Sequence, residues 1–259
     1  MTHAPTRRIT THDGSARSLP AEVPVAMVFD AQTQAVMMAT PADLADFATG
    51  FALTEGYVET PDQIRDIEIV THDTGHEARV WLAADRAAAL NARRRSMMGP
   101  VGCGLCGIDS LAQALRPVDP LPPGGLTLPA ADVAQATEVL RAHQPLHDET
   151  VAVHAAGFWQ AGGILLARED VGRHNALDKL IGALIRGGID PTSGAIVLTS
   201  RVSVDMVQKA AFARCPVLIA ASAPTAQALD LADRAGVTVA ASARHGRFDL
   251  YTHPERIRG

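Results

Sequence analysis

The densest group of side chains that could do chemistry lies between Arg168 and Lys179. The sequence there is Arg-Glu-Asp-Val-Gly-Arg-His-Asn-Ala-Leu-Asp-Lys. A strand-like apolar run, Gly163–Ala167, precedes it, and an amphipathic helix pattern follows it, so the polar cluster lies where a strand leads into a helix. Backbone N–H groups at a helix start favour anions, and α/β sheets bind ligands at the carboxyl ends of their strands. The density of charge therefore favours a binding site over a solvated, salt-bridged helix start.

A pair of cysteines forms the second unusual stretch. Cys103 and Cys106 lie in the segment Gly99–Gly107, which contains four glycines, and Arg93–Arg95 precedes it. The glycines predict a mobile loop over Met97–Gly107. Two thiols three positions apart can share or exchange sulfur, and nearby arginines lower a thiol pKa toward the reactive thiolate.

Four interpretations compete for this cysteine pair. A structural zinc site usually needs a second pair of ligands, and Cys215, alone in an apolar run, is better explained as a core residue; a zinc ion shared across a dimer stays open. A thioredoxin-type redox pair normally opens a helix after a strand. A zinc deaminase carries His-x-Glu before its cysteines, whereas His147–Glu149 follows them here. The glycines and positive charge best fit a persulfide carrier, in which one cysteine accepts a sulfane sulfur and the loop delivers it.

Two groups of elements position these residues. Before a proline-rich linker, Pro117–Gly125, we expect strands and a helix that Thr40-Pro41 would open, because Thr suits an N-cap and Pro the first turn. The predicted strands are Val23–Phe29, Gln34–Met38, Ile64–Val70 and Ala78–Leu82, and Ala83–Ala92 is helix-prone.

After the linker, short strands alternate with helices, which indicates a layered α/β domain. The predicted strands are Val151–Ala155, Gly163–Ala167, Ala195–Thr199, Val217–Ala221, Val237–Ala241 and an edge at Phe248–Tyr251. The predicted helices are Leu128–Gln144, His174–Arg186, Val204–Ala213 and Thr225–Ala235. We therefore predict an α/β (α+β) protein with a small N-terminal α/β domain, residues 1–117, ending in the cysteine loop, and a larger domain, residues 126–259.

Composition excludes several classes of protein. The chain has 259 residues, 47% apolar and 20% charged, with a formal net charge of -5. It can bury a sizeable core, and its charge argues against bulk nucleic-acid binding. No apolar run approaches the ~20 residues of a membrane span. The N-terminus lacks the apolar stretch of an export signal. Three cysteines make no disulfide framework, so we expect a cytoplasmic protein.

The ordered set of motifs resembles the formate dehydrogenase accessory sulfurtransferase family. The resemblance rests on Cys103–Gly107 together with Arg168–Lys179 and covers most of the chain, from about Glu22 to Ile257. Further matching segments are Met38–Leu44, Gly50-Phe51, Thr54–Gly56, Thr199–Ser203, Met206–Ala211, Ser222–Thr225 and Tyr251–Arg256.

This resemblance implies a cytoplasmic, homodimeric sulfurtransferase that takes sulfur from a cysteine desulfurase. It would pass the sulfur to a molybdenum or tungsten cofactor carrying molybdopterin guanine dinucleotides, so that formate dehydrogenase becomes active. The larger domain would resemble the cytidine deaminase fold without its zinc chemistry, and no metal ligands are expected. Cys103 would carry the persulfide, with Cys106 as its partner.

The resemblance also implies a cofactor-binding segment at Ser242-Ala243-Arg244-His245-Gly246-Arg247. The chain departs from the family at Ser242, where an aromatic residue is frequent, so Arg244 and Arg247 are the stronger candidates.

The residues support an anionic ligand independently, because polar groups follow several predicted strands. We include Arg173, His174, Arg201 and Ser222 in the cofactor site. Asp170 or Asp205 could accept the N–H groups of guanine, and the sequence leaves both open. His154 matches a family position, and a structural role fits it equally well. Two rival functions stay open: a chaperone that holds the cofactor and has a redox-active dithiol, and a thiol oxidoreductase.

Overall fold

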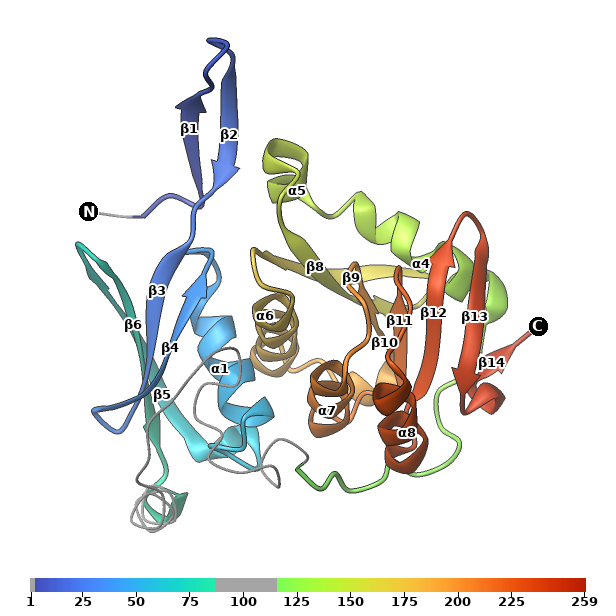
Figure 1. The fold of residues 1–259 in the computed structure, drawn as a ribbon. Coiled ribbons are helices and arrows are strands. Elements are labelled where there is room, and N and C mark those ends of the chain that lie inside the picture. Colours follow the sequence, from blue (N-terminus) through green and yellow to red (C-terminus); the bar gives the residue numbers. More distant parts are fainter. Residues whose placement is uncertain (1–2, 87–115) are drawn as a thin grey trace.

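The structure, a computed structural model, describes residues 3–86 and 116–259. Two separate β-sheets dominate it, one on each side of a central pair of helices (Figure 1). The α/β fold class expected from the sequence is confirmed. The cysteine loop at Met97–Gly107, Arg93–Arg95 and most of the helix-prone segment Ala83–Ala92 lie outside the described residues.

The first sheet has four strands in the order β4-β3-β6-β5. Their bounds are Val23–Phe29 for β3, Gln32–Ala39 for β4, Ile64–His72 for β5 and Gly75–Leu82 for β6. Strands β3 and β4 form a hairpin across Asp30 and Ala31, which both have positive φ, as the twist of a two-residue hairpin requires. All four strands expected before the linker are present.

One helix, α1 (Leu44–Thr54), covers the inner face of this sheet. Phe47 and Phe51 are buried against the strands. The helix begins a turn later than Thr40-Pro41 predicted, because Thr40 has a tertiary role: its N–H donates to the Asp170 carboxylate at 3.0 Å and its hydroxyl accepts from the Val171 N–H. A threonine held in this way by Asp170 and Val171 is not available to cap the helix.

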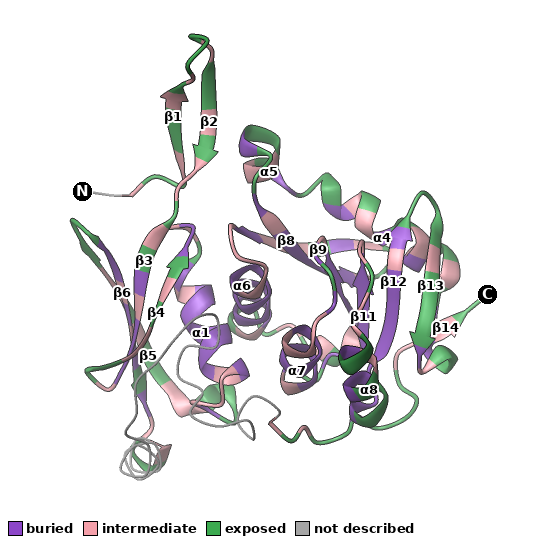
Figure 2. Ribbon diagram, viewed as in Figure 1, coloured by how far each residue is buried: buried purple, intermediate pink, exposed green. Residues whose placement is uncertain are grey.

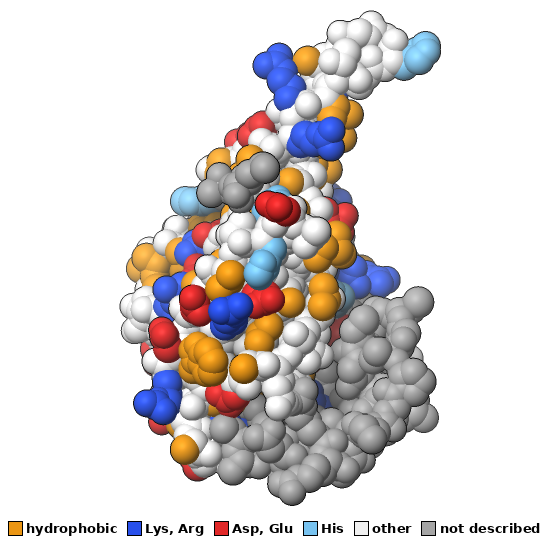
Figure 3. All heavy atoms as spheres, turned by 90° about the vertical axis from the view of Figure 1, so that its left-hand side faces the viewer, with side chains coloured by type: hydrophobic (Ala, Val, Ile, Leu, Met, Phe, Trp, Pro, Cys, Tyr) orange, Lys and Arg blue, Asp and Glu red, His pale blue; other side chains and the backbone are white. Residues whose placement is uncertain are grey.

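An N-terminal hairpin projects from the body of the molecule (Figures 1 and 3). Its strands are β1 (Thr6–Thr10) and β2 (Ala16–Pro20). The short helix α5 (Pro145–Thr150) contacts β2. Sequence patterning missed all three elements, since the hairpin strands have few apolar residues and α5 has barely more than one turn.

The second sheet has six strands in the order β13-β12-β11-β10-β8-β9. Strands β10, β11 and β12 are parallel, while β8 runs antiparallel between β10 and β9, so β9 points the same way as β10. The bounds are His154–Gln160 (β8), Gly163–Asp170 (β9), Ala195–Leu198 (β10), Val217–Ala220 (β11), Thr238–Arg244 (β12) and Arg247–Thr252 (β13).

Helices cover both faces of the second sheet, so its central strands are largely buried, as their purple colour in Figure 2 shows. On one face lie α6 (Arg173–Arg186), α7 (Val204–Phe212) and α8 (Ala226–Ala235), and on the other α4 (Ala130–Arg141). The predicted helices are therefore present, although α4 begins after a short strand, β7 (Leu128–Pro129), that pairs with β14 (Ile257–Arg258). Three 3-10 turns lie at Pro61–Gln63, Pro191–Ser193 and Pro254–Arg256.

Strand β8 lies three residues further along the chain than the sequence predicted. Val151 ends α5 in a left-handed conformation with φ 56°, and the strand begins only at His154. The prediction of Val151–Ala155 was wrong at its start, because the β-branched Val151 belongs to a helix end that the apolar pattern does not reveal.

The two sheets meet through α1 and α6, which cross at two glycines. A Cβ added to Gly50 would lie 1.8 Å from the Asp178 carbonyl oxygen, and one added to Gly182 would lie 1.8 Å from that of Asp46. Only glycine allows two helix backbones to approach this closely. The crossing fixes the first sheet against the helix that carries the polar run.

Candidate functional site

Polar loops line up along one edge of the second sheet. The parallel directions of β9, β10, β11 and β12 put their carboxyl ends on this edge. Loops beyond β10 and β11 are joined by a bridge between Val202 and Pro224, and Ser242 donates its N–H to the Ser222 carbonyl at 3.3 Å. Such an edge is where ligands of α/β sheets bind.

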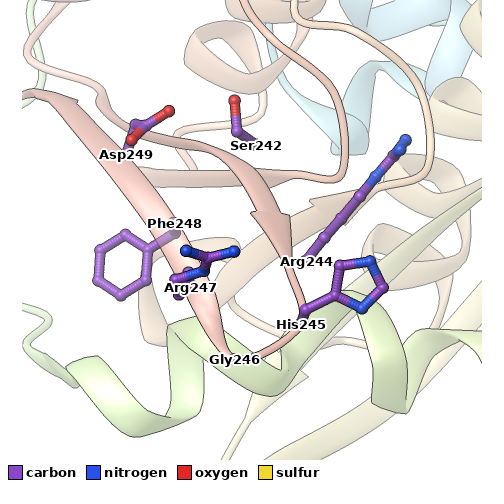
Figure 4. A pocket seen from close by; sticks show the side chains of 7 residues that line it. All are labelled: Ser242, Arg244, His245, Gly246, Arg247, Phe248 and Asp249. Carbon is purple, nitrogen blue, oxygen red and sulfur yellow. The ribbon is translucent and has the colours of Figure 1, made fainter.

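An open pocket of about 560 Å³ lies at the β12–β13 end of this edge (Figure 4). Its lining residues are Ser242, Arg244, His245, Gly246, Arg247, Phe248 and Asp249. The pocket thus contains five of the six residues of the predicted cofactor segment. Arg244 and Arg247 are both exposed at its rim, where guanidinium groups can bind phosphate oxygens in pairs.

Local backbone geometry shapes this pocket. Ser242 and His245 have φ of 53° and 54°, and the β12–β13 register is irregular between Ala241 and Arg244. Bulges of this kind redirect side chains at strand ends. The His245 N–H donates to Glu138 on α4 at 2.9 Å, and Arg244 donates to the Ser222 hydroxyl at 3.4 Å. These contacts hold the hairpin tip against both neighbours.

The pocket contains two residues that the sequence analysis did not select. Phe248 packs partly against the α4 side of the core, and Asp249 presents an exposed carboxylate that accepts from the Tyr251 hydroxyl at 3.5 Å. Alternation along the edge strand, which puts Arg247 and Asp249 on one face, was the signal that could have found Asp249. Ala243, by contrast, is fully buried in the core and offers only its carbonyl, which Thr137 occupies.

The other predicted cofactor residues lie on the same edge but outside this pocket. Arg173 and His174 begin α6, and Arg201 is exposed between β10 and α7. Strand spacing is about 4.8 Å, so the end of β9 lies about 19 Å from the end of β12 along the sheet. Ser222 contacts two pocket residues, since its hydroxyl accepts from Arg244 and its carbonyl from the Ser242 N–H.

Most polar side chains of the run Arg168–Lys179 bind other parts of the protein and are not free to bind a ligand. Arg168 donates to Asp46 on α1 at 2.8 Å, and Glu169 accepts the Leu146 N–H at 2.8 Å. Asp170 and Lys179 form a fully buried ion pair of 2.6 Å. Because Asp170 is completely buried, only Asp205, of the two carboxylates left open for guanine, reaches the surface.

A second buried network joins the C-terminal end of α1 to α6 and α7. Lys209 donates to Asp178 at 2.9 Å and to Glu55 at 2.7 Å. Burial acts to lower the pKa of Lys209, but the two carboxylates outweigh it and raise that pKa, so the lysine stays charged. The network therefore fixes the end of α1 against α6 and α7.

The remaining predictions concern cysteines, metals and membranes. Cys103 and Cys106 lie outside the described residues. Cys215 is fully buried, and burial raises its thiol pKa to about 12. Within residues 3–86 and 116–259, no group of three or more His, Cys, Asp or Glu side chains is arranged to hold a metal ion. No helix in the described part of the chain is long and apolar enough to cross a membrane.

The fold puts the chain in the class of layered α/β proteins, and its open pocket lies at the carboxyl end of β12 with Arg244 and Arg247 in its lining. The chain belongs to the FdhD/NarQ family, whose profile matches residues 20–258. The resemblance inferred from the motifs is thereby confirmed.

Individual relatives cover nearly the whole chain. The sulfur carrier protein FdhD of Agrobacterium fabrum is 51% identical over 242 residues, which are 93% of this chain and 89% of the relative. The protein of the same name from Xanthomonas campestris pv. campestris strain B100 is 49% identical over 238 residues, 92% of this chain and 84% of the relative. A crystal structure titled as a formate dehydrogenase accessory protein from Desulfotalea psychrophila superposes with a TM-score of 0.73 at 26% identity, covering 98% of this chain and 97% of that one.

Proposed function

We propose that this protein accepts sulfur from a cysteine desulfurase as a persulfide on Cys103 and delivers it to a molybdenum or tungsten cofactor with two guanine dinucleotide arms, which activates formate dehydrogenase. The observation that carries the proposal is the 51% identity, over 93% of the chain, to a protein named a sulfur carrier. We further propose that it works in the cytoplasm as a homodimer.

The first transfer balances without an external oxidant. The Cys103 thiolate attacks the terminal sulfur of the donor persulfide, a new S–S bond forms on Cys103, and the donor leaves as a thiolate. Transfer of the terminal sulfur then breaks the S–S bond and returns Cys103 to its thiolate form; the sulfur leaves at the sulfur(0) level, so the acceptor supplies the two electrons that make it a sulfide. Cys106 is the partner thiol, three residues away.

The pocket at the β12–β13 hairpin suits the nucleotide part of the acceptor, which is the substrate of this reaction. Arg244 and Arg247 supply charge for a diphosphate. Asp249 would repel phosphate, so it suits the N–H groups of a guanine base, which offers two donors to one carboxylate. Ser242 and His245 complete the rim.

Intact-mass analysis after incubation with a desulfurase and cysteine tests the transfer. We expect additions of whole sulfur atoms to the wild type and to Cys215→Ala, the matched control, and none to Cys103→Ala. Formate dehydrogenase activity in cells should follow the same order. Sulfur addition and full enzyme activity with Cys103→Ala would refute the assignment. If the wild type showed only a mass loss of two hydrogens, and Cys103→Ala still supported formate dehydrogenase activity, a cofactor-holding chaperone or a thiol oxidoreductase would be favoured.

Thermal unfolding with nucleotides tests the pocket. Guanosine diphosphate at 100 times its dissociation constant stabilises the fold by about 2.7 kcal/mol, and adenosine diphosphate should do less. Arg244→Ala should weaken both nucleotides, whereas Asp249→Asn should weaken guanosine diphosphate selectively. Equal stabilisation by the two nucleotides in the wild type would reduce the pocket to a general phosphate site.

A further inference from the structure

Two arginines adjoin the segment 87–115, which contains the cysteine pair, and both bind the same turn of the chain. Arg86 precedes the segment and Arg116 follows it. The turn is the C-terminal end of α1, residues 54–57, where a helix leaves carbonyl groups without intrahelical partners. Cationic side chains bind such carbonyls well, because the C-terminal end of a helix carries partial negative charge.

Each arginine donates hydrogen bonds directly to this turn. Arg86 donates from Nε to the Tyr57 carbonyl at 2.7 Å and from Nη2 to the Gly56 carbonyl at 2.6 Å. Arg116 donates from Nη2 to the Thr54 carbonyl. A Cβ added to Gly56 would lie 3.0 Å from Arg116 Nη1, so the glycine leaves room for this guanidinium. The three acceptors belong to four consecutive residues, and the residues on both sides of the segment are therefore held at one place.

Burial distinguishes these two arginines from ordinary surface residues. Only 14% of the Arg86 side chain and 20% of the Arg116 side chain are exposed. Glu59 lies 2.8 Å from the Arg86 guanidinium, and Glu55 lies 3.7 Å from that of Arg116. Arg116 also lies over the Phe212 ring of α7, 4.5 Å from its centroid. Fixing long side chains in this way costs conformational entropy, which these several contacts offset.

The turn that the arginines bind is itself fixed on two sides. Tyr57 stacks on Phe29 of the first sheet, with ring centroids 4.3 Å apart. On the other side, the Thr54 hydroxyl donates to the Asp178 carboxylate of α6 at 2.7 Å. Arg86 and Arg116 are therefore anchored to a rigid base.

We propose that Arg86 and Arg116 are positioning residues for sulfur transfer: they hold both ends of the segment that carries Cys103 against the end of α1 and so set where a protein partner meets that cysteine. The anchoring rests only on the contacts above, whereas its part in sulfur transfer rests on the proposed function. A role in helix capping alone would need only positive charge. Positioning by Arg86 needs its two donors in fixed geometry, which lysine does not supply.

Spin-label distance measurements test the anchoring without any sulfur chemistry. The labels are attached to Asp85→Cys and Pro117→Cys, two exposed positions beside the arginines, in a chain whose cysteine pair is replaced by alanine. We expect one narrow distance distribution, which Arg86→Gln and Arg116→Gln each broaden and shift to longer distances. The control Arg79→Gln, which removes a surface ion pair of β6, should leave it unchanged. Urea unfolding of each variant confirms that it is folded. An unchanged distribution in both anchor variants would overturn the proposal.

The choice of sulfur donor separates positioning from reactivity. Arg86→Gln should take up sulfur from a persulfidated desulfurase about tenfold more slowly or worse, since misplacing reacting groups by about 1 Å can cost ~100-fold. From cysteine persulfide, a small donor that needs no docking, it should take up sulfur at the wild-type rate. In both reactions the Cys103 thiolate attacks the terminal sulfur and the donor leaves as a thiolate. Arg86→Lys should behave like Arg86→Gln, and Arg79→Gln like the wild type.

Three outcomes of the donor assay would overturn the proposal: wild-type rates with both donors, equal slowing with both donors, or full rescue by Arg86→Lys. Equal slowing would mean that Arg86 acts on the reactivity of Cys103. If neither donor places sulfur on Cys103 in the wild type, the proposed function fails, whereas a distance distribution that broadens in the anchor variants would still support the anchoring.

Discussion

Removal of the Asp170 carboxylate should destabilise the protein far more than it changes ligand binding. Four donors surround this side chain. Lys179 Nζ lies at 2.6 Å, the Gly172 N–H at 2.8 Å, Asn175 Nδ2 at 2.9 Å and the Thr40 N–H at 3.0 Å. Asp170 and Lys179 are both completely buried. The pair also ties β9 and α6 to the end of β4.

The size of the effect follows from what Asp170→Ala leaves behind. Lys179 would keep its charge in the interior with one oxygen acceptor, the Thr40 carbonyl at 2.9 Å. Breaking a buried ion pair by removing one partner costs about 3–5 kcal/mol. The double variant Asp170→Leu/Lys179→Met removes both charges and should recover much of that loss, because an apolar pair of similar volume is tolerated.

Urea unfolding measures this prediction. With a denaturant slope of about 2 kcal/mol/M, the transition midpoint should fall by about 2 M in Asp170→Ala. The folded protein should still prefer guanosine over adenosine diphosphate, whereas Asp249→Asn should show the reverse behaviour: normal stability and a lost preference. A stability loss below about 1 kcal/mol, or a double variant no more stable than Asp170→Ala, would refute the reasoning. So would lost nucleotide preference with full stability, since that would make Asp170 a ligand-binding residue.

Three further predictions rest on single sites. Gly182→Ala should lower the unfolding free energy by about 1–3 kcal/mol or more, because the new Cβ would lie 1.8 Å from a backbone oxygen of α1. The control Gly163→Ala, which has open space around it, should cost far less in the same urea assay. Burial, followed by the positive charges of Arg173 and His174, lowers the pKa of His154 in the folded protein. The unfolded chain therefore binds a proton at His154 more readily, so the free energy of unfolding should fall as pH drops below about 6.5. This fall should be less steep in His154→Gln. Cys215, with its thiol pKa raised to about 12, should resist iodoacetamide in the folded protein and react once urea unfolds it; rapid labelling of Cys215 itself in native protein, located by peptide mass analysis, would contradict its burial.

The second sheet was predictable because its elements follow local rules. The apolar face of α6 and the glycines after Arg186 predict that helix and its end within one residue. The alternation of short strands with helices likewise predicts a layered domain. Local sequence patterns do not predict a residue's role when its hydrogen-bond partner is distant in the sequence. Thr40, for example, binds Asp170, which lies 130 residues later in the chain.

The candidate site was predictable only in part. The sequence identified a polar run by its density, but density does not reveal partners: Asp46, Thr54 and Glu55, all more than 100 residues away, pair with charges of the run or of α7. These contacts turn most of the run into an interface with α1 and the residues that flank it. Arg173 and His174 begin α6 and stay half-buried, and this exposure depends on the tertiary structure.

Helix α6 explains why binding and architectural residues are interleaved in one short segment. Its first turn presents Arg173 and His174 at the sheet edge, while Asp178 and Gly182, further along, contact α1 and the buried Lys209. A rigid ligand site needs first-turn residues whose helix cannot rotate or slide. The glycine crossing and the buried ion pairs provide that constraint, because sliding α6 by one turn would bury unpaired charges. Variants in the interface should therefore lower the free energy of unfolding, whereas Arg173→Gln should leave the fold intact.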